Sequence, residues 1–203
     1  MHNNGILMVL SGPAGSGKDT VLGELYKQIP EMKQSVSMTT RLPRDGETDG
    51  IDYYFVTKED FETSIKEGKM LEYAQYGSNF YGTPKEPVDK MLSDGKIVVL
   101  KIEVQGAENI RKLYPDLVSI FITPPNMSVL ESRLRKRGTE SEEDIRHRLE
   151  IASAELSRVG EYDYIVINDD LTNVVNDVKT IISAEKLKVS RRNNIISEVK
   201  KYV

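Results

Sequence analysis

The feature that most constrains the fold is a glycine-rich segment that joins an apolar run to a helical segment. The apolar run Ile6 to Leu10 leads into 12-GPAGSGKDT-20, and helix-forming residues continue to Gln28. Glycines let the backbone fold so that several N–H groups point inward, and the positive end of the helix faces the same point. Lys18 has the offset from which a lysine reaches the β- and γ-phosphates of a nucleotide. The segment predicts a phosphate-binding loop; the alternative is a glycine-rich turn that binds nothing.

Three further apolar runs repeat this pattern, and each is followed by a helical segment. The runs are nearly continuous in apolar residues, which is typical of strands covered on both faces in a parallel sheet. We therefore predict an α/β fold in which helices flank a parallel sheet through right-handed crossovers. The further strands are expected at Ile97 to Ile102, Val118 to Ile122 and Tyr164 to Ile167, and the helices at Lys18 to Gln28, Gln105 to Tyr114, Met127 onward and Leu171 to Lys188.

Two segments interrupt the alternation. Residues 35–96 carry short alternating strands and turn signals, and residues 127–158 have the pattern of two arginine-rich helices broken at Gly138. Capping-box spacing marks helix starts at Thr57 with Asp60 and at Ser141 with Asp144. The predicted division is a core part at 1–34, an inserted mixed α/β lobe at 35–96, core at 97–126, a mobile helical lid at 127–158, and core with a C-terminal helix and tail at 159–203.

Composition argues against several classes of protein. The 203 residues hold 28 Lys and Arg against 32 Asp and Glu, and a net charge of -4 does not suit a protein that coats nucleic acid. No stretch has the apolar length of a membrane span, and the N-terminus lacks a signal-peptide pattern, so a cytoplasmic protein is expected. With 0 Cys and 2 His, we expect no disulfide and no thiolate or histidine metal site. Ile195, Ile196 and Val199 have helical spacing and are expected to dock on this or another subunit, which leaves a homo-oligomer open.

A set of polar residues in the inserted lobe suits recognition of a nucleotide. Arg41 and Arg44 flank Leu-Pro and can form a fork around a dianionic phosphate, whose hydrogen bonds tyrosine hydroxyls complete. Glu72 can accept two parallel hydrogen bonds, which the N1–H and N2–H₂ edge of guanine offers and adenine does not. Hydroxyls of Ser37 and Thr83 can donate to guanine O6 or N7. Each residue alone is more often an ordinary surface or strand residue, so the prediction depends on the set: Ser37, Arg41, Arg44, Tyr53, Glu72, Tyr81 and Thr83.

The motifs together resemble the guanylate kinase family of nucleoside monophosphate kinases. The resemblance covers the chain from Ile6 to about Ile182, and the joint match is highly specific. It is carried by SGPAGSGK, SVSMTTRLPRDGE, GIDYYFV, EYAQYGSNFYGTP, IEVQG, RLRKRGTESEEDI and VINDDL, in the family's order.

The resemblance implies a P-loop kinase core, a GMP-binding lobe and a lid, and it assigns residues to each substrate. It places ATP contacts on Gly12, Pro13, Ala14, Gly15, Ser16, Gly17, Lys18, Asp19 and Thr20, and on Asn168 near the adenine. It places guanine contacts on Ser37, Glu72 and Thr83 with Glu103 as a nearby acid, and GMP phosphate contacts on Arg41, Arg44, Tyr53 and Tyr81. Mg²⁺ is the implied cofactor, held mainly by the ATP phosphates.

The implied reaction moves the γ-phosphoryl group of ATP to GMP, with dGMP as a second expected acceptor, and gives ADP and GDP in purine nucleotide metabolism. Transfer spreads negative charge over the oxygens between donor and acceptor, so converging cations stabilise it. Arg133 and Arg137 lie four residues apart on one helix face, and Arg148 lies on the next helix. With Lys18 they are the predicted catalytic residues. The expected partners are ATP and GMP, without nucleic acid or membrane.

Two other functions stay open from the sequence. One is an interaction domain that keeps this fold and has lost transfer; such a domain is expected to lose the phosphate loop or the lid arginines, yet Lys18, Arg137 and Arg148 are present. The other is a P-loop kinase for a different small acceptor, which the set around Glu72 opposes.

Two positions depart from the family's pattern. Asp19 follows Lys18 where a Ser or Thr usually ligates Mg²⁺, which leaves Asp19 or Thr20 as the metal's protein contact. Lys101 occupies a position where the family usually has an acid. Because the strand that ends near Lys101 should lie beside the phosphate loop, we predict that Lys101 pairs with Asp19 within about 4 Å. The alternative is that Lys101 points elsewhere and Asp19 faces solvent or metal.

Overall fold

A parallel sheet forms the centre of the molecule. The computed structural model describes residues 5–102, 104–136, 138, 141–192, 195, 199 and 201. In these residues the core sheet has five parallel strands in the order β2-β7-β1-β8-β9, which confirms the predicted α/β class. The strands are β1 Ile6–Ser11, β2 Met32–Gln34, β7 Ile97–Leu100, β8 Val118–Thr123 and β9 Tyr164–Ile167. The apolar pattern does not predict β2, because this edge strand has a single buried residue, Met32, followed by two exposed polar ones.

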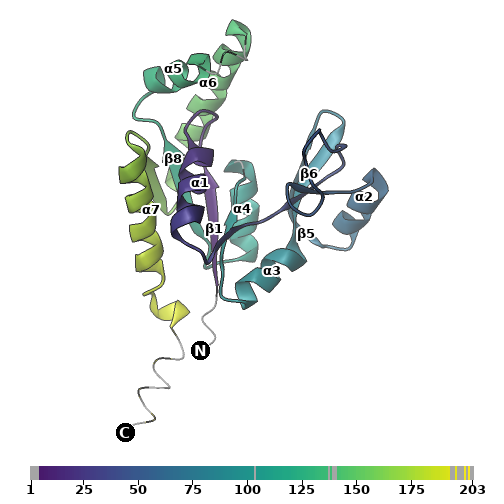
Figure 1. The fold of residues 1–203 in the computed structure, drawn as a ribbon, viewed down its shortest axis with the longest axis vertical. Coiled ribbons are helices and arrows are strands. Elements are labelled where there is room, and N and C mark those ends of the chain that lie inside the picture. Colours follow the sequence, from purple (N-terminus) through teal and green to yellow (C-terminus); the bar gives the residue numbers. More distant parts are fainter. Residues whose placement is uncertain are drawn as a thin grey trace.

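Helices cover both faces of the core sheet, as the continuous apolar strands require (Figure 1). Side chains of β1 alternate between the faces: Met8 and Leu10 pack with α1 Lys18–Gln28 and α7 Leu171–Glu185. Leu7 and Val9 pack with α3 Lys85–Ser93 and α4 Val104–Leu113. All six residues of β1 are buried, so the loop that follows this strand leaves from a rigid support.

The inserted lobe is a second, mixed sheet in the order β4-β3-β6-β5. Its strands are β3 Ser37–Thr39, β4 Tyr53–Phe55, β5 Met70–Tyr76 and β6 Asn79–Pro84, and α2 Lys58–Lys66 covers it. Phe61 of α2 is fully buried and stacks on Phe80 with ring centroids 5.5 Å apart. Thr57 caps α2 as predicted, since its side chain accepts from the Asp60 N–H. The lobe stands to one side of the core sheet in Figure 1.

Helix α3 lies within the range predicted for the lobe, yet it packs on the core. Its Val88 is fully buried among Leu7, Val98 and Leu100 of the core strands. The chain thus returns to the core directly after β6, which ties the end of that strand to the central sheet. The five-part division of the chain remains a prediction.

The predicted lid consists of α5 Met127–Lys136 and α6 Glu142–Ser157. These helices form their own small apolar cluster, in which Leu130, Leu134 and Ile145 are buried. The capping box at Ser141 and Asp144 is present with both hydrogen bonds, which confirms the predicted start of α6. A separate cluster lets the two helices pack together without depending on the core sheet.

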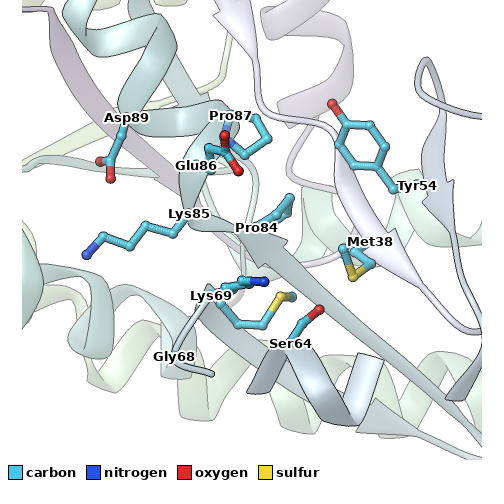
Figure 2. Close-up of a pocket in the computed structure, with 11 residues that line it drawn as sticks. Met38, Tyr54, Ser64, Gly68, Lys69, Pro84, Lys85, Glu86, Pro87 and Asp89 are labelled. Carbon is cyan, nitrogen blue, oxygen red and sulfur yellow. The ribbon is translucent and has the colours of Figure 1, made fainter. Parts of the chain in front are cut away.

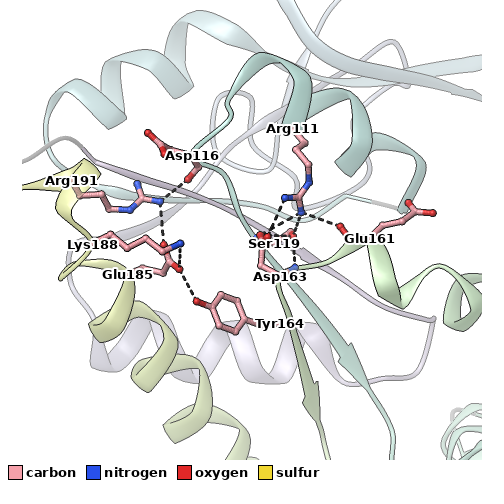
Figure 3. A network of polar contacts seen from close by, with 9 residues as sticks. All are labelled: Arg111, Asp116, Ser119, Glu161, Asp163, Tyr164, Glu185, Lys188 and Arg191. Carbon is pink, nitrogen blue, oxygen red and sulfur yellow. Dashed lines mark hydrogen bonds and ion pairs between the residues drawn. The ribbon is translucent and has the colours of Figure 1, made fainter.

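Two polar networks tie the C-terminal part to the core (Figure 3). Glu185 is 1% exposed; its carboxylate accepts from the Tyr164 hydroxyl at 2.7 Å and pairs with Lys188 and Arg191. This fixes the end of α7 and the short 3-10 helix Val189–Arg191. Beyond it Ile195 and Val199 are exposed, and Ile196 lies outside the described residues, so docking of this segment on another subunit remains a prediction.

Asp163, in the second network, joins α4 to strand β8. Its carboxylate accepts from Arg111 at 3.1 Å and from both the backbone N–H and the hydroxyl of Ser119 at 2.8 Å (Figure 3). Burial raises the pKa of Asp163, but the hydrogen bonds from Arg111 and Ser119 outweigh burial and hold this pKa below its ordinary value. The ionised carboxylate therefore stabilises the folded state.

We expect Asp163→Asn to lower the free energy of unfolding by about 1–2 kcal/mol at neutral pH, because Arg111 and Ser119 lose a charged acceptor at a partly exposed site. The folded-state pKa lies below the unfolded value of about 3.9, so this stabilisation is complete above the unfolded value and disappears as the pH falls through the folded-state value. Urea unfolding at neutral pH and at about pH 3.5 tests this, with Asp177→Asn on the exposed face of α7 as the control. Equal losses in both variants, or a loss that does not shrink in acid, would contradict it.

Candidate active site

The loop between β1 and α1 has the backbone of a phosphate cradle. Gly12 and Gly17 have φ values of 142° and 90°, which side-chain-bearing residues rarely adopt. A Cβ on Gly12 would lie 2.0 Å from the Ile122 carbonyl oxygen, and one on Gly17 would lie 2.3 Å from Asn168 Nδ2. Only glycine fits these two positions, and Gly17 directly precedes the first turn of α1, where backbone N–H groups are open to an anion.

Two side chains hold this loop from outside. Asn168, buried after β9, donates from Nδ2 to the Ser16 carbonyl oxygen at 2.7 Å. Arg133 of α5 donates to the Asn168 carbonyl oxygen at 2.8 Å, and its other terminal nitrogen lies 3.5 Å from the Ser16 carbonyl oxygen. The predicted lid arginine thus contacts the phosphate loop, whereas the predicted contact of Asn168 with adenine remains a prediction.

Polar groups inside the loop are suited to an anionic ligand. The Ser16 hydroxyl is buried and has no hydrogen-bond partner within the described part of the chain. A buried hydroxyl without a partner is costly, and a phosphate oxygen would provide the missing acceptor. The Lys18 ammonium folds over the loop and donates to the carbonyl oxygens of Gly12 and of Pro13, the latter at 3.0 Å. These two observations place a donor and a cation where phosphates are expected.

The predicted pairing of the two unusual residues is confirmed. Lys101 Nζ lies 2.8 Å from Asp19 Oδ1. The pair is open to solvent, since the side chains are 41% and 76% exposed. Thr20, the next hydroxyl, is also exposed in the first turn of α1. An exposed ion pair contributes little to stability, so a metal or phosphate can exchange with either partner at low cost.

A cleft of about 840 Å³ opens between the lobe sheet and the end of β7. Four of the predicted acceptor residues line it, namely Ser37, Tyr53, Glu72 and Tyr81, together with Lys101. These residues come from β3, β4, β5, β6 and the segment after β7, so the fold gathers side chains that are up to 64 positions apart in sequence (Ser37 to Lys101). The cleft therefore adjoins the phosphate loop through the Lys101–Asp19 pair.

Glu72 is held in this cleft by a neighbouring strand. Glu72 and Thr83 are directly paired across β5 and β6, and the Thr83 hydroxyl donates to Glu72 Oε1 at 2.6 Å. Thr83 is 1% exposed and is not among the residues that line the cleft. Donation of this hydroxyl to guanine stays a prediction for the bound state. The hydrogen bond orients the Glu72 carboxylate within the cleft.

Arg41 is oriented by an acid that the sequence analysis did not single out. Its two terminal nitrogens donate to the two carboxylate oxygens of Glu47, each at 2.8 Å, and its guanidinium lies over the Tyr53 ring at 5.4 Å. Glu47 also accepts from the Arg44 backbone N–H at 2.7 Å. The hydrogen bonds from Arg41, with that of the Arg44 N–H, lower the pKa of Glu47 to about 2, so Glu47 stays ionised at neutral pH.

A second cavity, of about 490 Å³, lies where the lobe meets α3 (Figure 2). Its lining includes Met38, Met70 and Pro84, with Lys85 and Glu86 among the charged residues. The described lining of this cavity includes none of the predicted site residues, whereas Ser37, Tyr53, Glu72 and Tyr81 line the other cleft; Arg41, Arg44 and Thr83 line neither. The predicted chemistry is therefore concentrated at one place, next to the phosphate loop.

Comparisons with known proteins point to one family. The sequence model of the guanylate kinase family matches residues 4–185. A guanylate kinase of Desulfitobacterium hafniense is 47% identical over 198 residues, which cover 98% of this chain and 99% of that protein. A guanylate kinase of Listeria monocytogenes is 50% identical over 193 residues, 94% of each chain. The chain belongs to the guanylate kinase family. The crystal structure of guanylate kinase from Anaplasma phagocytophilum matches with a TM-score of 0.72 and 34% identity, over 93% of this chain and 90% of that one.

Membership of the guanylate kinase family makes this chain a nucleotide kinase, an ATP:GMP phosphotransferase, with a P-loop kinase fold. In the described part of the chain, no helix is long and apolar enough to cross a membrane. The same residues contain no group of three or more His, Asp or Glu side chains that could hold a metal.

Several residues assigned through the guanylate kinase resemblance are less defined. Glu103 and Arg137 lie outside the described residues. Arg148 is half-buried on α6, and Arg44 is exposed on the loop that holds Glu47. Their substrate contacts remain predictions. Glu47 was not predicted as a site residue. The sequence holds only a weak sign of its contact with Arg41, which it follows by six residues within a turn-rich segment.

Proposed function

We propose that this chain transfers the γ-phosphoryl group of ATP to GMP, and also to dGMP, in the cleft beside its phosphate loop. One observation carries the choice of acceptor: Thr83 presents the Glu72 carboxylate in the same cleft that holds Tyr53, Tyr81 and Lys101. A carboxylate that a neighbouring hydroxyl orients, with a cluster of phosphate-binding groups beside it, suits a guanine nucleotide. The proposed products are ADP and GDP.

On the donor side, the loop from Gly12 to Thr20 would bind the ATP phosphates, with Ser16 and Lys18 as donors. Mg²⁺ fits the donor set, because Asp19 and Thr20 supply the hard oxygens that it prefers and the phosphates supply the rest. When bound, Mg²⁺ neutralises charge on the β- and γ-phosphates. We expect Asn168 and Arg133 to keep the loop in its binding conformation, since both contact the Ser16 carbonyl.

On the acceptor side, Ser37, Glu72 and Thr83 would bind guanine, and Arg41, Arg44, Tyr53 and Tyr81 the phosphate. Three of the proposed phosphate-binding residues lie together, because Arg41 lies over Tyr53 and the rings of Tyr53 and Tyr81 pack edge to face at 6.1 Å. A GMP phosphate oxygen then attacks the γ-phosphorus as the bond to the β-phosphate oxygen breaks, and that oxygen leaves on ADP with the electron pair. The attacking phosphate is already ionised, so positioning and charge stabilisation supply the rate.

The lid supplies further cations in this proposal. Arg133, Arg137 and Arg148 would approach the transferring group as α5 and α6 close over it, and closure would exclude water. Arg135 is different: it is exposed and pairs with Glu131 and Glu142, which is typical of an arginine on a solvated surface. The substrates are free nucleotides, and we propose a cytoplasmic setting without nucleic acid or membrane partners. The lobe at 35–96 and the lid at 127–158 would be the moving parts.

A coupled assay of ADP release across GMP, dGMP, AMP, UMP and CMP tests the proposal. We expect turnover with GMP and weaker turnover with dGMP, and little with the other acceptors. Binding of GMP without any ADP release would favour an interaction domain that has lost transfer. Preference for AMP, UMP or CMP would instead indicate a kinase with another acceptor.

We expect Glu47→Gln to raise the KM for GMP several-fold with a smaller effect on the KM for ATP. The neutral amide cannot hold both terminal nitrogens of Arg41 by charged hydrogen bonds, so the guanidinium loses its orientation. Steady-state kinetics with each substrate varied in turn measures this, and Glu67→Gln, an exposed acid after α2, is the control. An unchanged KM for GMP would mean that Glu47 is not needed to position Arg41.

A further inference from the structure

Lys101 lies between the two substrate sites. It follows β7, which is the neighbour of β1 in the sheet, and it lines the acceptor cleft with Glu72 and Tyr81. Its ammonium contacts Asp19 in the first turn of α1 at 2.8 Å, one residue after Lys18. A single side chain therefore reaches from the acceptor cleft to the helix that begins at the phosphate loop.

The neighbouring cations are held differently. Lys18 donates to backbone carbonyls of the loop, Arg41 is held by both oxygens of Glu47, and Arg133 donates to Asn168 and Ser16. The partner of Lys101 is a carboxylate that is 76% exposed. Exposed ion pairs contribute little to stability, so the ammonium can turn from Asp19 to a stronger anion at little cost.

The reaction brings two anions to this junction. The ATP phosphates and the GMP phosphate repel each other as they approach, and this repulsion grows as water leaves the cleft. A cation placed between them reduces the repulsion for both and does so most when both are bound. A lysine is suited to this, because its ammonium is a compact charge with three donors on a flexible chain.

We propose that Lys101 binds the phosphates of both substrates at their junction, and that Asp19 holds its ammonium there before they arrive. The proposal rests on the proposed function, since it takes the cleft as the GMP site and the loop as the ATP site. The proposal predicts coupling between the two substrates. With Lys101 present, each substrate binds more tightly when the other is already bound, and loss of the ammonium weakens this effect. Lys101 would then bind the substrates during the transfer step, in addition to its predicted role as the partner of Asp19.

The test is a calorimetric titration of GMP into the protein, with and without saturating Mg²⁺ and the non-hydrolysable β,γ-imido analogue of ATP. For Lys101→Met we expect the Kd of GMP to rise about 5- to 10-fold more with the analogue than without it, within the usual range of coupling between sites. Guanosine, which lacks the phosphate, should show no such difference. Lys101→Arg should restore much of the coupling, and Lys85→Met, an exposed lysine of the second cavity, should leave it unchanged.

The outcomes separate this proposal from the proposed function. If the unmodified protein binds GMP no better than AMP, the proposed function fails. If it prefers GMP but Lys101→Met retains the full coupling, or weakens guanosine as much as GMP, the role of Lys101 is wrong while the function stands. Loss of coupling in Lys101→Met with rescue by Lys101→Arg supports the proposal, and loss in both variants contradicts it.

Discussion

Glu72→Gln is expected to lower kcat/KM for GMP by about 10- to 100-fold, because a buried hydrogen bond to a charged group contributes about 1.5–3 kcal/mol. Glutamine keeps the size of the side chain, but it replaces one acceptor oxygen by an NH₂ donor. If Thr83 still donates to the remaining oxygen, the NH₂ group faces the N1–H and N2–H₂ donors of guanine. Two donors that face each other repel, so the loss is expected mainly in acceptor binding.

The KM for ATP should change little in this variant, since Glu72 lies on β5 in the lobe and the phosphate loop follows β1 in the core. Steady-state kinetics with GMP and with ATP varied separately provides the measurement. Glu86→Gln is a matched control, because Glu86 is an exposed acid that lines the second cavity rather than the acceptor cleft. Unchanged GMP kinetics in Glu72→Gln would remove Glu72 from the site.

The core of the fold could be predicted because its signals are local. Each core strand except β2 is a nearly continuous apolar run, and the glycine-rich loop and the capping-box spacing at Thr57 and at Ser141 mark helix starts directly in the sequence. The short strand β2 and the edges of the lobe lack such signals. Strand β6 and helix α3 follow each other without a connecting segment, because Pro84 both ends the strand and is the N-cap of the helix.

The sequence indicates which residues belong to the candidate site, but it does not indicate most of the contacts between them. The sequence indicates that Glu72 and Thr83 belong to one site, yet only the pairing of β5 with β6 places the hydroxyl on the carboxylate. The role of Glu47 depends on how the loop after β3 folds back, which no periodicity encodes. The Asp19–Lys101 pair was predictable because parallel neighbouring strands end at the same edge of a sheet.

Lys18→Ala should reduce kcat on the order of 10²- to 10³-fold, which is the usual effect of removing one donor to charge that develops during transfer. Lys18 is well placed for this role, since its ammonium already lies over the loop carbonyls of Gly12 and Pro13 in the space where phosphates are expected. Alanine leaves the glycine backbone and the contacts of Ser16 with Asn168 and Arg133 intact. The phosphate loop should therefore keep its backbone conformation while the ammonium group is lost, so folding should be affected far less than turnover.

Single-turnover phosphoryl transfer with saturating ATP and GMP measures the chemical step, and urea unfolding measures stability in the same preparations. Lys27→Ala, an exposed lysine in the last turn of the same helix, tests whether any loss of positive charge on α1 has the same effect. Lys18→Met, which keeps the length of the aliphatic chain, should be as slow as Lys18→Ala, because the charge and not the packing is needed. A normal kcat in either Lys18 variant would exclude the residue from the transfer step, and an equal loss in Lys27→Ala would show that the effect is not specific to the loop.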